Sequence, residues 1–147
     1  MKTIPSSSTG AYRQDEANDC VVRAITNVSG KPYDEVHALL KKHGRKDKKG
    51  TYWPTSVAVM KELGYTCVAL GKSQAAKFFE YKMNNNLINT EPRKTLGRVV
   101  SELPKGKYVV YYRGHATALV DGGIVDTFDN KKNREVVALF YDPKQFG

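Results

Sequence analysis

The sequence predicts a domain of the α+β class, with helices in its first half and an antiparallel sheet in its second half. Residues 20–63 contain three segments in which apolar side chains recur at helical spacing. Residues 107–141 contain short runs rich in Val and Tyr that are separated by turn signals. Helices followed by strands, without regular alternation, favour segregated helices and an antiparallel sheet over a parallel fold.

Length and composition are those of one globular domain. The chain has 147 residues, of which 40% are hydrophobic, and a chain of this size buries a core without help from a disulfide or a metal. We expect residues 1–10, which are rich in Ser, Thr and Gly, to be a flexible terminus and residues 11–147 to form the single domain. The sequence shows neither an apolar run long enough to cross a membrane nor a secretory signal, so we expect a cytoplasmic protein.

The helical segments begin and end at residues that favour helix ends. The first is expected over residues 20–28, with Asn18 or Asp19 as its N-cap. A second is expected over residues 32–43, where a proline occupies the first turn, and a third over residues 54–63. Cys20 therefore opens a helix.

The remaining segments complete the predicted order. Residues 65–70 read as a short strand, and residues 95–103 as a helix. Between them, we expect residues 72–91 to form a surface connection, in which residues 75–81 could form a short helix. The expected strands that follow form an antiparallel meander, and they cover residues 107–113, 115–120, 124–128 and 134–141.

Cys20 is the first candidate for chemistry. A thiol in the first turn of a helix lies at the positive end of the helix dipole, which favours the thiolate. The alternative is that Cys20 is a small buried hydrophobic residue, the usual environment of a cysteine without a partner. The second cysteine, Cys67, lies in a predicted strand and should face the core, so we expect two reduced thiols.

Gln14 lies six residues before Cys20, and its side-chain amide could donate a hydrogen bond to an oxyanion beside the backbone N–H of Cys20. This spacing at a helix start resembles the papain-like cysteine peptidases, in which a glutamine lines the oxyanion hole and the cysteine heads the central helix. Those enzymes place a histidine late in the chain, on a strand that faces this helix. His115 opens such a strand here, between Gly114 and Ala116, and would serve as the general base.

The resemblance extends to small phage-encoded or bacterial papain-fold proteins. In them a Gly-His strand is followed by an Asp-Thr-aromatic-Asp turn, which matches residues 114–115 and 126–129. The chain departs from full-length papain peptidases because it is shorter and lacks the Cys-Gly-x-Cys-Trp surroundings of the nucleophile. Asp19 precedes Cys20 instead, and Val21 follows it.

Three residues are candidates to orient the His115 imidazole. A two-residue loop at Gly122-Gly123 would place Asn130 opposite His115. Asp126 shares that face of the strand, and its carboxylate would stabilise an imidazolium better than an amide. A three-residue loop or a bulge would bring Asp129 opposite instead, so all three remain open.

The resemblance implies a hydrolase of the thiol protease type. Its thiolate would attack a carbonyl to form an acyl-enzyme, and His115 would pass the proton to the leaving amine. The substrate would be a protein or peptide, which could be acidic, and the bond would be a peptide, isopeptide or side-chain amide. No His or Cys pair has metal-ligand spacing, so we expect no metal or other cofactor, and we expect His37 and His43 to be structural or solvated.

Two alternatives follow from charge and from loss of activity. The chain has 24 basic and 15 acidic residues, a net charge of +9, and a basic run lies within residues 41–49. This run is expected to be a solvated loop. In the first alternative, the chain is a binding module that contacts nucleic acid through this run, and Cys20 has no catalytic role. A papain-fold scaffold that has lost activity and captures a partner is the other alternative.

Overall fold

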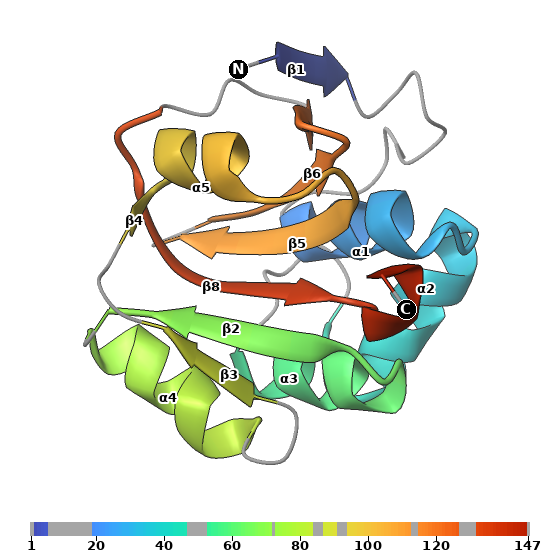
Figure 1. The fold of residues 1–147 in the computed structure, drawn as a ribbon. Coiled ribbons are helices and arrows are strands. Elements are labelled where there is room, and N and C mark those ends of the chain that lie inside the picture. The colour runs from blue at the N-terminus through green and yellow to red at the C-terminus, as the bar shows by residue number, and fades with distance from the viewer. Residues whose placement is uncertain are drawn as a thin grey trace.

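The computed structural model describes residues 2–5, 19–46, 53–71, 73–83, 87–90, 94–112, 115–126 and 132–146. Within these ranges the chain forms helices and one mixed sheet, so the α+β class is confirmed (Figure 1).

The helices follow the spacing of apolar residues. They are α1 (Cys20–Ser29), α2 (Tyr33–Lys42), α3 (Trp53–Glu62), α4 (Gln74–Lys82) and α5 (Leu96–Glu102), and a short 3-10 helix (Pro143–Phe146) follows the last strand. The predicted bounds of α1, α2, α3 and α5 are confirmed to within one residue. The possible helix over residues 75–81 is α4, which begins after Ser73, whose hydroxyl accepts a hydrogen bond from the N–H of Ala76.

The described strands form one sheet. They are β1 (Lys2–Pro5), β2 (Thr66–Leu70), β3 (Leu87–Thr90), β4 (Lys94–Thr95), β5 (Lys107–Tyr112), β6 (His115–Val120), β7 (Gly123–Asp126) and β8 (Glu135–Tyr141). Their order across the sheet is β1-β7-β6-β5-β8-β2-β3, and β4 pairs with β8. The predicted antiparallel run of β5, β6 and β7 is confirmed.

The predicted meander is wrong in its last strand. β8 does not pair with β7 but lies between β5 and β2, antiparallel to both. All five side chains from Val136 to Phe140 are buried, so both faces of this strand are covered. A strand that is apolar on both faces belongs in the middle of a sheet, which is where the chain places β8.

The two outer strands of this path were not predicted. β1 lies in the segment expected to be a flexible terminus and pairs in parallel with β7, whereas residues 6–18 lie outside the described residues. β3 lies in the segment expected to be a surface connection and pairs in parallel with β2.

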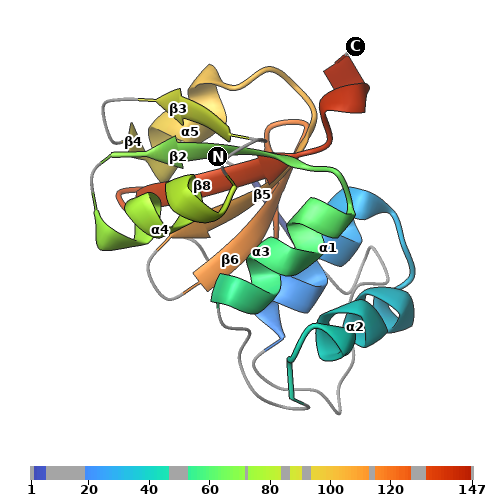
Figure 2. The ribbon, with the colours of Figure 1, turned by 90° about the horizontal axis from the view of Figure 1, so that it is seen from below.

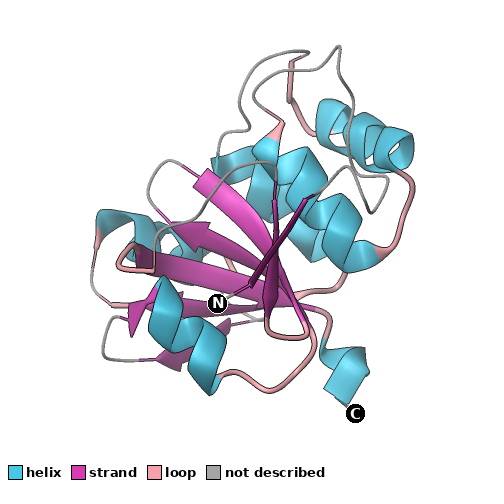
Figure 3. Ribbon diagram, turned by 90° about the horizontal axis from the view of Figure 1, so that it is seen from above, coloured by secondary structure: helices cyan, strands magenta, loops and turns pink. Residues whose placement is uncertain are grey.

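Helices cover both faces of the sheet (Figure 3). Side chains of α1, α2, α3 and α4 share one core with Val109 and Tyr111 of β5, and we call this side the α1 face. Side chains of α5 share a second core with Tyr108, Val110 and Tyr112, and we call that side the α5 face. Figure 2 shows α2 outside α1 and α3, farther from the strands.

Candidate functional site

Cys20 is the first residue of α1, as predicted, and its side chain is half-buried against the core of the α1 face. The helix is held to the sheet by an apolar stripe in which Val22 and Ile25 are fully buried. Burial of two such side chains contributes about 3–6 kcal/mol, at about 1.5–3 kcal/mol each. The thiol is therefore held at the end of a well-anchored helix and is accessible in part.

Asp19 occupies the N-cap position of α1, but its side chain makes no cap hydrogen bond. Its carboxylate instead accepts a hydrogen bond of 2.6 Å from the Tyr33 hydroxyl and pairs with the Arg23 guanidinium one turn along the helix. Asp19 is 1% exposed, so this carboxylate is buried with its partners. It does not cover the free N–H groups of the first turn, which surround Cys20.

His115 is the first residue of β6 and lies opposite Tyr112 of β5. Their ring centroids are 5.4 Å apart, and the Arg134 guanidinium lies 4.8 Å from the centroid of the same Tyr112 ring. Because residues opposite each other on paired strands share a face, and Tyr112 belongs to the core of the α5 face, His115 lies on that side.

Cys20 and His115 lie on different faces of the sheet. Cys20 packs against the core of the α1 face. Strand alternation directs Ala116 to the α1 face and His115 to the α5 face. The structure thus places the predicted nucleophile and base on opposite faces, with the imidazole against the Tyr112 ring.

The predicted register of the β6–β7 hairpin is wrong by one residue on each strand. Val120 pairs with Gly123, so the loop is Asp121-Gly122 and not Gly122-Gly123. Both loop residues have positive φ, 49° for Asp121 and 85° for Gly122, as a type I′ turn requires. Asp121 is thus a turn residue.

This register changes the argument for the residue that orients His115. Paired positions sum to 243 (120 + 123), so a continued ladder would place position 128 opposite His115, and not Asn130. Asp126 is the last residue of β7. The side chain of Asp126 and the whole of Gln14, Asp129 and Asn130 lie outside the described residues.

Cys67 is the buried counterpart of Cys20. It is fully buried in β2, as predicted, and burial raises the pKa of its thiol to about 12. Both cysteines are free thiols. Only Cys20 therefore combines partial exposure with a helix N-terminus.

Two buried hydroxyls, those of Tyr111 and Ser56, were not predicted. The Tyr111 and Ser56 side chains are 4% and 0% exposed, and no described group accepts or donates a hydrogen bond at either hydroxyl. Burial raises the pKa of Tyr111, nearby Ser56 lowers it, and charge on Cys20 or Cys67 would raise it further. The signal in the sequence was the period of two along β5, which puts Tyr111 on the face opposite that of Tyr112.

The other histidines have structural contacts, as predicted. Nε2 of His37 lies 3.2 Å from the Arg45 guanidinium, and Nε2 of His43 lies 3.2 Å from the Glu62 carboxylate. Arg45 is only 4% exposed, and Lys42 pairs with Glu62 at 3.1 Å. The basic run is thus not a uniformly solvated loop, because part of it belongs to α2 and to the core.

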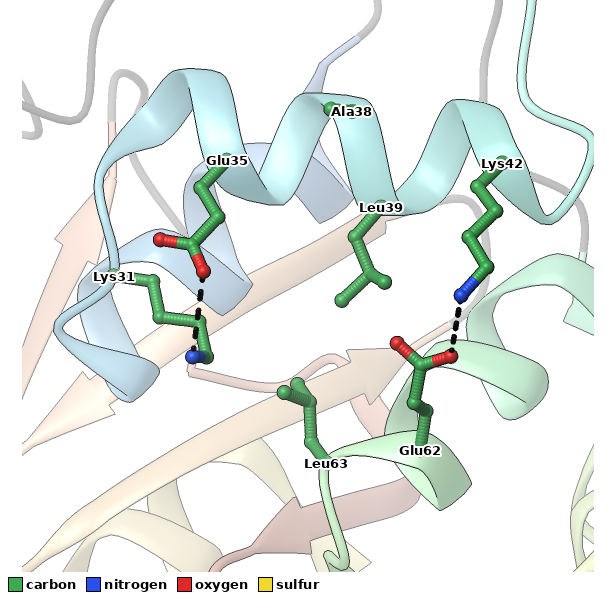
Figure 4. A pocket seen from close by; sticks show the side chains of 7 residues that line it. All are labelled: Lys31, Glu35, Ala38, Leu39, Lys42, Glu62 and Leu63. Atoms are coloured by element: carbon green, nitrogen blue, oxygen red, sulfur yellow. Dashed lines mark hydrogen bonds and ion pairs between the residues drawn. The ribbon is translucent and has the colours of Figure 1, made fainter.

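An open groove of about 420 Å³ lies between α2 and the end of α3 (Figure 4). Leu39 and Leu63 point into it, and two ion pairs, Lys31–Glu35 and Lys42–Glu62, flank it. Its lining includes neither Cys20 nor His115.

No protein-family model, curated protein or solved structure matches the chain. Among the described residues, no group of three or more His, Cys, Asp or Glu side chains could hold a metal ion. None of the described helices is long and apolar enough to cross a membrane.

Proposed function

We propose that the chain is a cysteine-dependent hydrolase in which Cys20 is the nucleophile and His115 the general base. The observation that carries this proposal is the position of the half-buried Cys20 thiol at the N-terminus of α1, a helix that packs against β6, the strand that His115 begins. A thiolate is favoured there by the helix dipole and by first-turn N–H groups that Asp19 does not cap.

In this mechanism the Cys20 thiolate attacks a carbonyl carbon and forms an acyl-enzyme, and water then hydrolyses the thioester. His115 takes the thiol proton and delivers it to the leaving amine. This step requires the imidazole to leave the Tyr112 ring and approach the sulfur, and such hydrogen bonds are often incomplete before substrate binds. The backbone N–H of Cys20 and the Gln14 amide would stabilise the oxyanion.

The finer parts of the proposal rest on the resemblance to papain-like cysteine peptidases. They are the papain-like fold itself, the role of Gln14, a third residue among Asp126, Asp129 and Asn130, and a protein or peptide substrate in the cytoplasm. The order Gln14, Cys20, His115 supports them. The corrected hairpin register removes the pairing of Asn130 with His115 that a Gly122-Gly123 loop would give.

Hydrolysis assays on matched variants test the proposal. The wild-type chain, Cys20→Ala, His115→Ala and the control His43→Ala are incubated with peptide-amide, isopeptide and glutamine side-chain amide probes. We expect Cys20→Ala and His115→Ala each to lose all measurable hydrolysis, since members of a catalytic unit fail together, and His43→Ala to retain it. Activity that survives either change, or no hydrolysis of any probe by the wild type, contradicts the proposal.

The binding-module alternative is favoured by the net charge of +9, and it has a distinct signature. A triple charge reversal of Lys46, Lys48 and Lys49 would abolish a nucleic-acid complex whose affinity falls steeply with salt. The burial of Arg45 and the pairing of Lys42 with Glu62 leave this surface with less basic charge than the run of residues suggests.

A further inference from the structure

The open groove between α2 and the end of α3 is lined by a second stripe of α2, separate from the stripe that the helix buries in the core (Figure 4). Glu35, Ala38, Leu39 and Lys42 recur at the spacing i, i+3, i+4 and i+7, which places them on one side of a helix. Ala38 is exposed and Leu39 is half-buried. This side of α2 therefore faces solvent with apolar side chains at its centre.

The charges of this stripe are complementary to themselves. Glu35 and Lys42 are seven residues apart (42 − 35 = 7), so they lie two turns apart on the same side, about 10.5 Å along the helix axis. A two-fold axis that passes between Ala38 and Leu39 turns a second copy of α2 antiparallel to the first. Glu35 then meets Lys42 of the second copy, and Lys42 meets its Glu35.

The ion pairs beside the groove extend this pattern. Nζ of Lys31 lies 3.6 Å from Glu35, and Nζ of Lys42 lies 3.1 Å from Glu62. In the two-fold arrangement these pairs join end to end, and the charges alternate in sign along each side in the order Lys31, Glu35, Lys42 of the second copy and Glu62 of the second copy. The two lysines and two glutamates that line the groove sum to zero, whereas the chain carries +9, so local charge does not oppose contact here.

The centre of the groove is apolar and accessible. Leu39 and Leu63 point into it, and Ala38 lies beside Leu39 on α2 (Figure 4). An apolar centre with charged residues around it is the usual anatomy of a protein–protein interface. Because α2 lies outside α1 and α3, farther from the strands, the sheet does not obstruct an approaching helix (Figure 2).

We propose that a second copy of this chain occupies the groove, with the two α2 helices antiparallel across a two-fold axis between Ala38 and Leu39. Each copy of α2 then lies in the groove of the other, so one interface fills both grooves. The apolar centre is small, and we expect a weak dimer with a dissociation constant on the order of 10–100 µM. The proposal is independent of the proposed function, because neither Cys20 nor His115 lines the groove.

Sedimentation velocity of the wild type and of charge-reversed variants, from about 5 to about 500 µM, tests the proposal. Glu35→Lys makes two lysines face each other on both sides of the axis, and Lys42→Glu does the same with two glutamates. We expect each change to raise the dissociation constant at least about tenfold. The matched control is Lys41→Glu, which makes the same charge change on an exposed residue of α2 that does not line the groove, and it should dimerise like the wild type.

A mixture of the two variants gives the decisive result. When Glu35→Lys and Lys42→Glu are combined in equal amounts, a lysine meets a glutamate on both sides of the axis, so dimers should form again between the two variants. Both changed residues are exposed, and circular dichroism of each variant checks that the fold is kept. A wild type that is monomeric throughout, single variants that dimerise as well as the wild type, or a mixture that stays monomeric each overturns the proposal and excludes a second copy as the occupant.

Discussion

Two buried tyrosines of β5, one on each face of the sheet, differ in the hydrogen bonding of their hydroxyls. On the α5 face, the Tyr108 hydroxyl donates to the carbonyl oxygen of Pro104 at 2.9 Å. On the α1 face, the Tyr111 hydroxyl has no partner among the described residues. The two tyrosines belong to the same strand, so the difference comes from the face and not from the local sequence. Both thiols also lie on the α1 face. The buried hydroxyl that lowers the stability of the fold is therefore on the same face as the proposed nucleophile.

The largest expected effect separates the two thiols of the α1 face. At pH 7.5 a thiol with a pKa of about 12 is ionised in about one molecule in 30,000, against about one in ten for an ordinary thiol. Because the thiolate is the reacting form and Cys67 is also buried, we expect iodoacetamide to label Cys20 at least about 10³-fold faster than Cys67. Peptide mapping by mass spectrometry measures both rates, and equal labelling would contradict the contrast between the two cysteines.

The next effect concerns the buried carboxylate of Asp19 at the start of α1. Asp19→Ala removes the carboxylate that pairs with Arg23 and accepts from Tyr33, and it leaves a buried guanidinium without that carboxylate. We expect the free energy of unfolding in urea to fall by about 3–5 kcal/mol. The control Glu35→Ala removes an exposed ion pair with Lys31 and should cost about 0.3–0.5 kcal/mol. Equal losses in the two variants would show that the buried pair contributes no more than a surface pair.

A third effect depends on pH. Burial raises the pKa of Cys67 to about 12, whereas an unfolded thiol titrates near about 8.5. The neutral thiol therefore stabilises the fold fully below the unfolded pKa, and this contribution is lost as the pH rises from about 8.5 towards 12. Between pH 7 and 10.5 we expect the wild type to lose about 2.7 kcal/mol more unfolding free energy than Cys67→Ala. If the unfolding free energies of the wild type and Cys67→Ala changed with pH in parallel, the assigned burial of the Cys67 thiol would be contradicted.

The smallest effect tests the two hydroxyls directly. Tyr108→Phe removes a completed hydrogen bond and should lower the unfolding free energy by about 1 kcal/mol. Tyr111→Phe removes a hydroxyl without a described partner and should leave the unfolding free energy unchanged or raise it. Chemical denaturation measures the free energy of unfolding of both variants. A larger loss of unfolding free energy in Tyr111→Phe than in Tyr108→Phe would contradict the difference between the two hydroxyls.

The sequence predicted local structure well because the signals are local. The helix of Cys20 was recognised from the spacing of residues such as Val22 and Ile25, and the start of α5 from Thr95, whose hydroxyl accepts from the N–H of Arg98. The place of β8 was not predicted, because pairing with β5 and β2 joins residues far apart in the chain. The hairpin register was missed because Asp121-Gly122 and Gly122-Gly123 both suit a tight turn.

The candidate site was predictable only in part. The sequence placed Cys20 at a helix start and His115 at a strand start, since both positions depend on neighbouring residues. It did not show that Asp19 would bind Tyr33 instead of capping α1, because Tyr33 belongs to the next helix. Nor did it show that the Tyr111 and Ser56 hydroxyls would be buried near each other, because they come from two different elements of the fold.

The central claim is that Cys20 and His115 act as one unit, and the rate of Cys20 alkylation between pH 5 and 9 tests it most directly. A thiolate paired with an imidazolium reacts below the pH at which a lone thiol ionises. We predict that the wild type keeps appreciable reactivity at pH 6, and that His115→Ala loses it and follows one transition at higher pH, whereas His43→Ala matches the wild type. If His115→Ala gives the same profile as the wild type, His115 is not the base of Cys20 and the account is contradicted.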